Sequence, residues 1–139
     1  MADRYWVGGT ANWDGTAGTK WATISGGGGG ASVPTTSDNV FIDVASGTVT
    51  VTIASGNTGC LDLNMSGFTG TVAGNTNITV AGSLTYGSGM TPSSYVGTFN
   101  MNSTSSRTIT TNGYTSPGFQ KAPWFATGRD GRAVTCPRP

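Results

Sequence analysis

The residues that most constrain the fold of this chain are 48–54, which read Thr-Val-Thr-Val-Thr-Ile-Ala. Apolar and polar side chains alternate strictly here, which places Val49, Val51 and Ile53 on one face of a strand and the threonines on the other. β-Branched residues are typical of strands and lose side-chain freedom in helices. No window of the chain shows a helical period. We therefore expect an all-β protein.

Shorter segments of the same kind recur along the chain, separated by turns rich in glycine, serine and asparagine. The sequence predicts strands at 40–44, 48–54, 60–65, 70–72, 77–80, 83–86, 95–101 and 107–111. Similar apolar residues recur at offsets of roughly 21 to 25 residues, which is near the length of one coil of a β-solenoid. The recurring series are Leu61, Leu84 and Ile109; Val72, Tyr95 and Val96; and Ile78 and Met101.

These offsets favour a short parallel β-solenoid, or β-helix-like scaffold. An antiparallel β-sandwich is the alternative, because it also consists of many short strands at regular spacing.

The first 39 residues have a different composition from the strand segments. Trp6, Trp13 and Trp21 lie between glycine-rich turns, and residues 26–30 are all glycine. Such a run predicts a flexible or tightly turning loop, because glycine loses the most entropy when it is ordered. We interpret residues 1–39 as an N-terminal cap within the same domain as a strand core at 40–115. The tryptophans could stack on sugar rings, but we favour apolar packing inside the cap.

Residues 116–139 form a third segment, with four of the six prolines and a basic charge balance. Proline removes backbone donors, so this segment cannot be a central strand. We predict a basic docking arm that lies across a neighbouring subunit. Its candidate partner-binding residues are Phe119, Lys121, Trp124, Phe125, Arg129 and Arg132. An unstructured terminus and a segment from a shifted reading frame are the alternatives.

The charge pattern excludes several classes of protein. The net charge is +1, charged residues are 9% of the chain, and no basic cluster precedes the last segment, so we expect no nucleic-acid partner. No apolar stretch has the length of a membrane helix, and the N-terminus resembles no signal peptide. We therefore expect folding in a cytosol, where Cys60 and Cys136 remain free thiols.

Catalytic groups are scarce in this sequence. Without His or Glu, acid–base chemistry would depend on four of the six aspartates or on a lone tyrosine, and no pair stands out as an acid and a base. These aspartates are Asp14, Asp38, Asp43 and Asp62. Asp14 and Asp38 are interpreted as turn residues that bond to nearby backbone. We therefore expect no enzyme activity and no catalytic residue.

Two other parts of the sequence resemble ligand-binding patterns but lack residues that such sites require. Asp38, Asn39 and Asp43 could offer oxygens to Ca²⁺, but they are too few for such a site. Residues 15–20 resemble a phosphate-binding loop, yet Lys20 is followed by Trp21 instead of Ser or Thr. We therefore expect no metal and no cofactor.

Several motifs together resemble a known group of proteins. They are Trp-x-Gly-Gly-Thr-x-x-Trp at 6–13, a further Trp at 21, Val-Pro-Thr-x-x-Asp-x-Val at 33–40, and then Thr-Val-Thr-Val and Leu-x-Leu. This order resembles the start of bacterial β-helical passenger and adhesin-like proteins. It is still more similar to phage and prophage virion structural proteins with the same opening. The resemblance covers roughly residues 4–115, and the missing signal peptide favours the virion group.

The resemblance implies a non-enzymatic structural protein on the virion surface, folded in the bacterial host cytoplasm. A capsid decoration or cement protein is the favoured function, with the major capsid protein or other virion subunits as partner. The scarcity of large aliphatic residues further predicts a homo-oligomer, for which a trimer is one arrangement. The alternative is a tail-fibre or adhesin-like module that binds cell-surface glycans.

Overall fold

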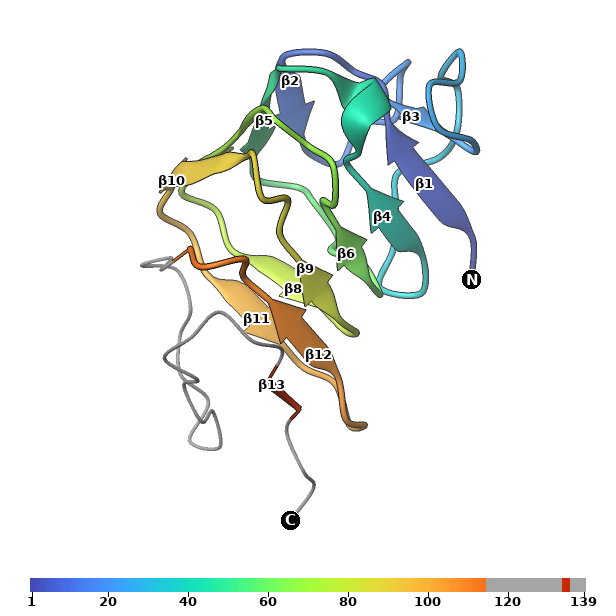
Figure 1. Cartoon of the computed structure of the whole chain (residues 1–139). Coiled ribbons are helices and arrows are strands. Elements are labelled where there is room, and N and C mark those ends of the chain that lie inside the picture. The colour runs from blue at the N-terminus through green and yellow to red at the C-terminus, as the bar shows by residue number, and fades with distance from the viewer. Residues whose placement is uncertain (115–133, 136–139) are drawn as a thin grey trace.

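A computed structural model describes residues 1–114 and 134–135, and it has the architecture of a short β-solenoid of about three turns (Figure 1). Its strands are β1 (Asp3–Trp6), β2 (Ala11–Trp13), β3 (Trp21–Ala22), β4 (Asn39–Phe41), β5 (Thr50–Ile53), β6 (Leu63–Asn64), β7 (Thr71–Gly74), β8 (Ile78–Val80), β9 (Leu84–Thr85), β10 (Thr91–Tyr95), β11 (Phe99–Met101), β12 (Thr108–Thr110) and β13 (Val134–Thr135). A single 3₁₀ turn, η1 (Val44–Ser46), follows β4 in the described chain.

The strands form three sheets that the chain visits in turn. Sheet A has the order β13-β12-β9-β6-β4-β1-β3, sheet B the order β10-β7-β5-β2, and sheet C pairs β11 with β8. Successive coils pair in parallel, as β6, β7 and β8 do with β9, β10 and β11. Parallel pairing between consecutive coils confirms the predicted solenoid, because a sandwich would join neighbouring strands by antiparallel hairpins.

The inward positions of sheet A form one continuous column. Val40 pairs with Leu63, Leu63 with Leu84, and Leu84 with Ile109. The sequence series that placed Leu61 in this column was wrong by two positions. Leu61 lies before the start of β6, where the chain leaves its bridge at Cys60 and turns into sheet A.

Two other sequence predictions were wrong in detail, in sheet C and at its border with sheet B. Ile78 pairs with Phe99 and not with Met101, which is again a slip of two residues along one face. The predicted strand at 95–101 is two strands, β10 and β11, that belong to different sheets. The chain turns between them at Gly97, where a Cβ atom would overlap the Thr76 carbonyl oxygen of the preceding coil.

In the middle of the solenoid most paired residues lie 21 residues apart, as Leu63 and Leu84 do, whereas Val40 and Leu63 are 23 apart and Leu84 and Ile109 are 25 apart. Side-chain hydrogen bonds join Thr48 to Thr69 and Thr98 to Asn77, both across a separation of 21 residues. At the start of the chain the separation is 40 residues, between Thr50 and Thr10. The first coil is longer because β3 and the glycine-rich loop are inserted between β2 and β4.

The first 39 residues therefore build the first coil as well as its cover. β1 and β2 pair in parallel with β4 and β5, while β3 runs antiparallel along the outer edge of β1. At the other end β13 runs antiparallel along β12. Both outer strands of sheet A thus differ in direction from the parallel strands between them, which limits further pairing at these edges.

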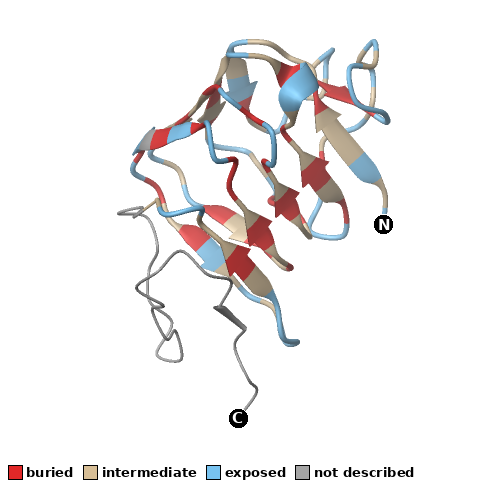
Figure 2. Cartoon of the chain, in the orientation of Figure 1, coloured by how far each residue is buried: buried red, intermediate tan, exposed pale blue. Residues whose placement is uncertain are grey.

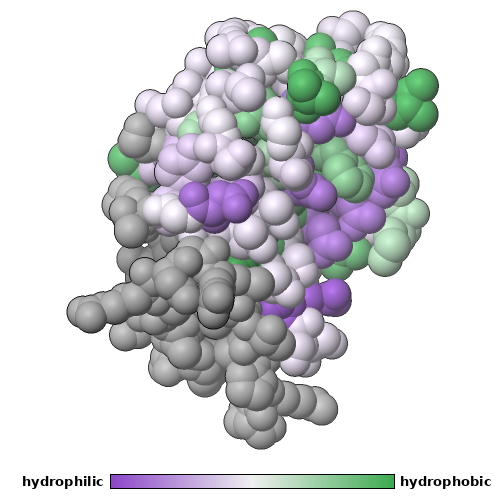
Figure 3. Space-filling view, in the orientation of Figure 1, coloured by the Kyte–Doolittle hydropathy of each residue, from purple (hydrophilic) through white to green (hydrophobic). Residues whose placement is uncertain are grey.

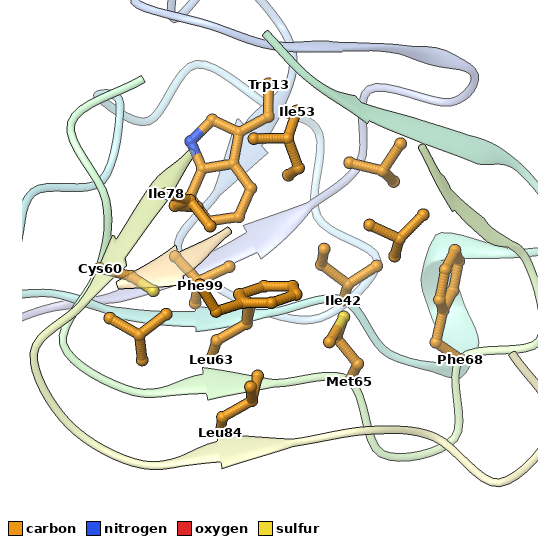
Figure 4. Packing of buried hydrophobic residues seen from close by; sticks show 14 of the residues in the cluster. Trp13, Ile42, Ile53, Cys60, Leu63, Met65, Phe68, Ile78, Leu84 and Phe99 are labelled. Carbon is orange, nitrogen blue, oxygen red and sulfur yellow. The ribbon is translucent and has the colours of Figure 1, made fainter. Parts of the chain in front are cut away.

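The interior is packed along its whole described length. Figure 2 shows that buried residues follow the strands of every coil, whereas exposed residues lie mainly in the connections. Figure 4 shows Ile53, Leu63, Phe68 and Leu84 converging from different coils on one interior. Aromatic clusters lie toward both ends, with the three tryptophans in the first coil and Tyr86, Tyr95 and Phe99 in the coil on which β12 stacks.

Glycines at the corners let consecutive coils approach closely. A Cβ atom added to Gly70 would overlap the Val49 carbonyl oxygen, and one added to Gly74 would overlap that of Ile53. Gly74 also has a φ of +111°, a conformation that other residues adopt only with strain. The glycines of these corners are therefore required by the stacking of the coils.

We expect Gly74→Ala to lower the free energy of unfolding by on the order of 2–4 kcal/mol, since it adds backbone strain and a clash with the neighbouring coil. Gly28→Ala is the matched control, because no heavy atom lies within 4 Å of the added Cβ and its φ is ordinary. Its effect should be about 0.5 kcal/mol or less. Urea denaturation of both variants measures the difference, and equal effects would contradict the proposed role of the corner.

Candidate functional site

The tryptophans that could have formed a sugar-binding platform are core residues. Trp6, Trp13 and Trp21 are at most 1% exposed. Trp21 makes edge-to-face contacts with Trp6 and Trp13, with 5.0 and 5.2 Å between ring centroids. The indole N–H of Trp6 donates a hydrogen bond to the Gly9 carbonyl. Such contacts match the quadrupoles of the rings. The prediction that they pack inside the cap is confirmed, and none of them can stack on a ligand in this conformation.

Asp38 joins the start of the chain to the turn at residues 35–38. Its carboxylate is 9% exposed and accepts hydrogen bonds from the backbone N–H of Ala2 at 2.9 Å and from the N–H and hydroxyl of Thr35 at 3.1 and 2.9 Å. Burial disfavours its charged form, but these bonds and the charge of Arg4 outweigh burial and hold the pKa of the carboxyl below its usual value. Asp38 is therefore ionised and fully occupied by protein donors.

Asp43 has a similar local role at η1. Its carboxylate accepts from the Ala45 N–H at 3.0 Å, and its own N–H donates to the Ser46 hydroxyl. That hydroxyl donates in turn to the Trp6 carbonyl at 2.8 Å, which ties η1 to the first coil. No group of three or more metal-binding side chains occurs in the described residues. The side-chain amide of Asn39, the third candidate Ca²⁺ ligand, donates a hydrogen bond to the Asp3 carboxylate at 2.9 Å.

Asp14 and Lys20 close an exposed turn. The Lys20 ammonium lies 2.9 Å from the carboxylate, and both the N–H and the hydroxyl of Thr16 donate to it. The hydrogen bonds from Thr16, followed by that from Lys20, lower the pKa of Asp14 to about 2. Residues 15–20 thus surround a carboxylate, which is the opposite of what a phosphate-binding loop requires.

Asp62 links two coils, since it accepts from the Ser83 N–H of the next coil at 2.7 Å. All four candidate aspartates therefore accept backbone hydrogen bonds that hold the fold in place. The buried Cys60 is a free thiol whose pKa is raised by burial, so it has little thiolate character. Cys136 lies outside the described residues.

The outer face of sheet B is uncharged and rich in hydroxyl groups. Thr50, Thr71 and Thr91 lie in register across three coils, and Asn12 lies beside Thr52. No described strand of sheets B or C contains a charged residue, whereas β1 of sheet A contains two. Figure 3 shows the strongly hydrophilic side chains gathered mainly on the side of β1, β4 and β6.

Two exposed valines border sheet B. Val44 is 76% exposed at the corner between β4 and β5, and Val96 is 66% exposed at the corner between β10 and β11. Both corners adjoin a strand of sheet B. The uncharged face therefore continues onto apolar side chains along either side, which is the character of a protein-contact surface more than of a charged-ligand site.

The six predicted partner-binding residues at 119–132 lie outside the described part of the chain. Val134 and Thr135, which fall in the same predicted arm, pair with Ile109 and Thr108 of β12. At least these two residues therefore belong to sheet A. As expected for a Pro-rich segment, their strand lies at the edge of the sheet and not in its centre.

Sequence reasoning missed the polar side chains that bridge coils. Asn77 accepts from the Thr98 N–H, the Ser83 hydroxyl accepts from the Thr108 N–H, and the Asn112 amide donates to the Tyr86 carbonyl. The sequence does contain a signal for these bridges, because Asp, Asn or Ser recurs just before several strands. This recurrence can be recognised only when the register of the coils is known.

No family model, curated protein or solved structure matches this chain significantly. In the part of the chain that is described, no helix has the length and apolar character needed to cross a bilayer.

We expect Asp38→Asn to lower the free energy of unfolding at neutral pH by on the order of 1–3 kcal/mol, because charged hydrogen bonds are lost. The carboxyl has a lower pKa in the folded state than its ordinary value of 3.8. Its contribution is therefore complete above that value and is lost as the pH falls through the folded pKa.

Urea denaturation at a series of pH values between neutral and about pH 2 measures this dependence. Asp14→Asn is the comparison, since the pKa of Asp14 is also lowered, to about 2, but its turn is exposed. Asp38→Asn should flatten the acid side of the stability curve. An unchanged acid slope would show that Asp38 does not hold the N-terminal region in the way described.

Proposed function

We propose that this chain is a non-enzymatic structural protein of a phage particle, a capsid decoration or cement protein that binds and stabilises the virion surface. The observation that supports the proposal is the structural role of the motifs that resemble those of virion proteins. The three tryptophans of the first motif and its neighbourhood pack together and close the first coil. Asp38, which belongs to the motif at 33–40, binds the backbone N–H of Ala2 and so holds the N-terminus in place. These residues thus build a closed end of the solenoid.

A block of closely stacked coils suits this function. Backbone pairing and glycine corners fix each coil on the next, so the outer faces are preorganised and lose little entropy when they dock. The partner in this proposal is the major capsid protein or another virion subunit.

Sheet B is the face that we assign to the virion contact. It has no charged strand residue, its threonines present methyl and hydroxyl groups in register, and exposed Val44 and Val96 border it. Docking through this face leaves the charged side of sheet A in solvent, in keeping with the depletion of charge in interface centres. A trimer would repeat this contact around a symmetry axis of the particle.

Particles of a phage that encodes this chain provide the test. The protein should be present at stoichiometric copy number, and stripping it should lower the temperature at which the particles release their genome. Re-addition should restore heat resistance. If stripped particles resist heat as well as complete ones, the cement function is excluded. Capture of cell-surface glycans by the isolated protein would instead favour a tail-fibre or adhesin-like module.

Thr71→Lys should prevent re-addition, because it buries an unpaired charge in the proposed contact. Thr85→Lys is its matched control, since Thr85 lies on sheet A in the outward register of Asn64 and Thr110. Both residues are half-buried, so both variants should fold alike by circular dichroism. Equal particle binding by the two variants would show that sheet B does not form the contact with the virion.

Deletion of residues 117–139 should leave a folded solenoid that assembles less well. It removes the predicted basic arm together with β13, which covers the edge of β12. Deletion of residues 136–139 alone is the control, since it keeps β13. Light scattering measures the solution mass, and thermal unfolding measures the stability. Normal assembly of the longer deletion would exclude a docking role for the arm.

A further inference from the structure

The turn at residues 111–114 fastens the last described coil to the coil before it. The Tyr114 N–H donates to the Thr111 carbonyl at 3.0 Å, and Asn112 and Gly113 between them have φ values of 49° and 85°. Asn112 is the single non-glycine residue with positive φ in the described chain. Asparagine tolerates this conformation better than most residues, which explains its presence here.

Two side chains of this turn reach back to the preceding coil. The Asn112 amide nitrogen donates to the Tyr86 carbonyl at 2.5 Å, and the Tyr114 hydroxyl donates to the Ser88 carbonyl at 2.9 Å. The Tyr114 ring also lies against Tyr86, with 6.3 Å between ring centroids. Tyr86 is one of the largest buried side chains, so the turn covers part of the core.

The same turn contains the one Asn-Gly pair of the sequence, and both of its residues are exposed. Among described residues, no hydrogen bond uses the Gly113 N–H. Glycine has no Cβ and therefore offers the least hindrance to attack by its backbone nitrogen on the preceding side chain.

We propose that Asn112 is a site of spontaneous chemical modification through a cyclic imide. The Gly113 nitrogen loses its proton and forms a bond to Cγ of Asn112, while the Cγ–Nδ2 bond breaks and ammonia leaves. Water then opens the five-membered ring at either carbonyl, which yields an aspartate or an isoaspartate at this position. No oxidant or reductant is needed.

The modification removes a contact that the fold uses. The new carboxylate cannot donate to the Tyr86 carbonyl and repels its oxygen, so the bond at this point becomes a repulsive contact. An isoaspartate also lengthens the backbone of the turn by one carbon. Both products should separate Tyr114 from Tyr86 and expose part of the core that the turn covers. We therefore expect this turn to be the first described part of the solenoid to loosen when the protein is stored.

The reaction is tested on the full-length protein held in mildly alkaline buffer made with heavy-oxygen water. Peptide mapping should find the mass gain of amide hydrolysis, with label, at Asn112 and both aspartate isomers there. Asn100 and Asn102 are internal controls, because both are exposed but are followed by Met101 and Ser103. Equal conversion at the controls, or none at Asn112, would overturn the proposal.

Two variants test the consequence. Asn112→Gly keeps the positive φ but has no side-chain amide, so modification at this position should stop. Asn112→Asp should reproduce the aged protein. Hydrogen exchange should be faster in residues 108–114 of the aged wild type and of Asn112→Asp than in fresh wild type. Equal exchange in aged and fresh wild type, despite complete conversion, would show that Asn112 does not secure the turn.

Discussion

The structure depends on parallel backbone pairing between consecutive coils. A coil of 21 residues brings Leu63 beside Leu84 and Val51 beside Val72, so equivalent side chains stack in columns through the interior. Each strand is only two to five residues long and would not be stable alone. The columns and ladders are therefore cooperative, since each coil buries the apolar face of its neighbours.

This arrangement explains the unusual composition. Glycines occupy corners where the backbone of one coil touches the carbonyl groups of the next, as at Gly70 and Gly74. Aspartate, asparagine and serine satisfy the backbone groups that the corners interrupt, as Asp62 does for Ser83 and Asn77 for Thr98. A core with few large aliphatic residues suffices because it is narrow and because aromatic clusters lie toward both of its ends.

The sequence predicted the fold class because the alternation at 48–54 is a local signal of a strand, and the offsets of roughly 21 to 25 residues match the spacing of paired strands after the first coil. It misplaced Leu61 and the partner of Ile78, since a slip of two residues keeps the same face inward and leaves the pattern unchanged. The corner at Gly97 was hidden because a glycine in a strand-like run also fits a bulge. The roles of Asp38 and Asn112 depend on contacts across 36 and 26 residues, which a single sequence does not display.

The distribution of polar groups connects this architecture to its proposed function. Each candidate aspartate is bound to backbone donors, so these side chains serve the fold and do not form a pocket. The outward positions of sheet B carry no charge, and their regular spacing follows directly from the coils beneath them. A surface that is neutral and regularly spaced gains affinity chiefly from shape and from repetition of the contact, because single hydroxyl and methyl groups contribute little. Such a surface is best suited to a partner that is itself repetitive, and a capsid lattice is a partner of that kind.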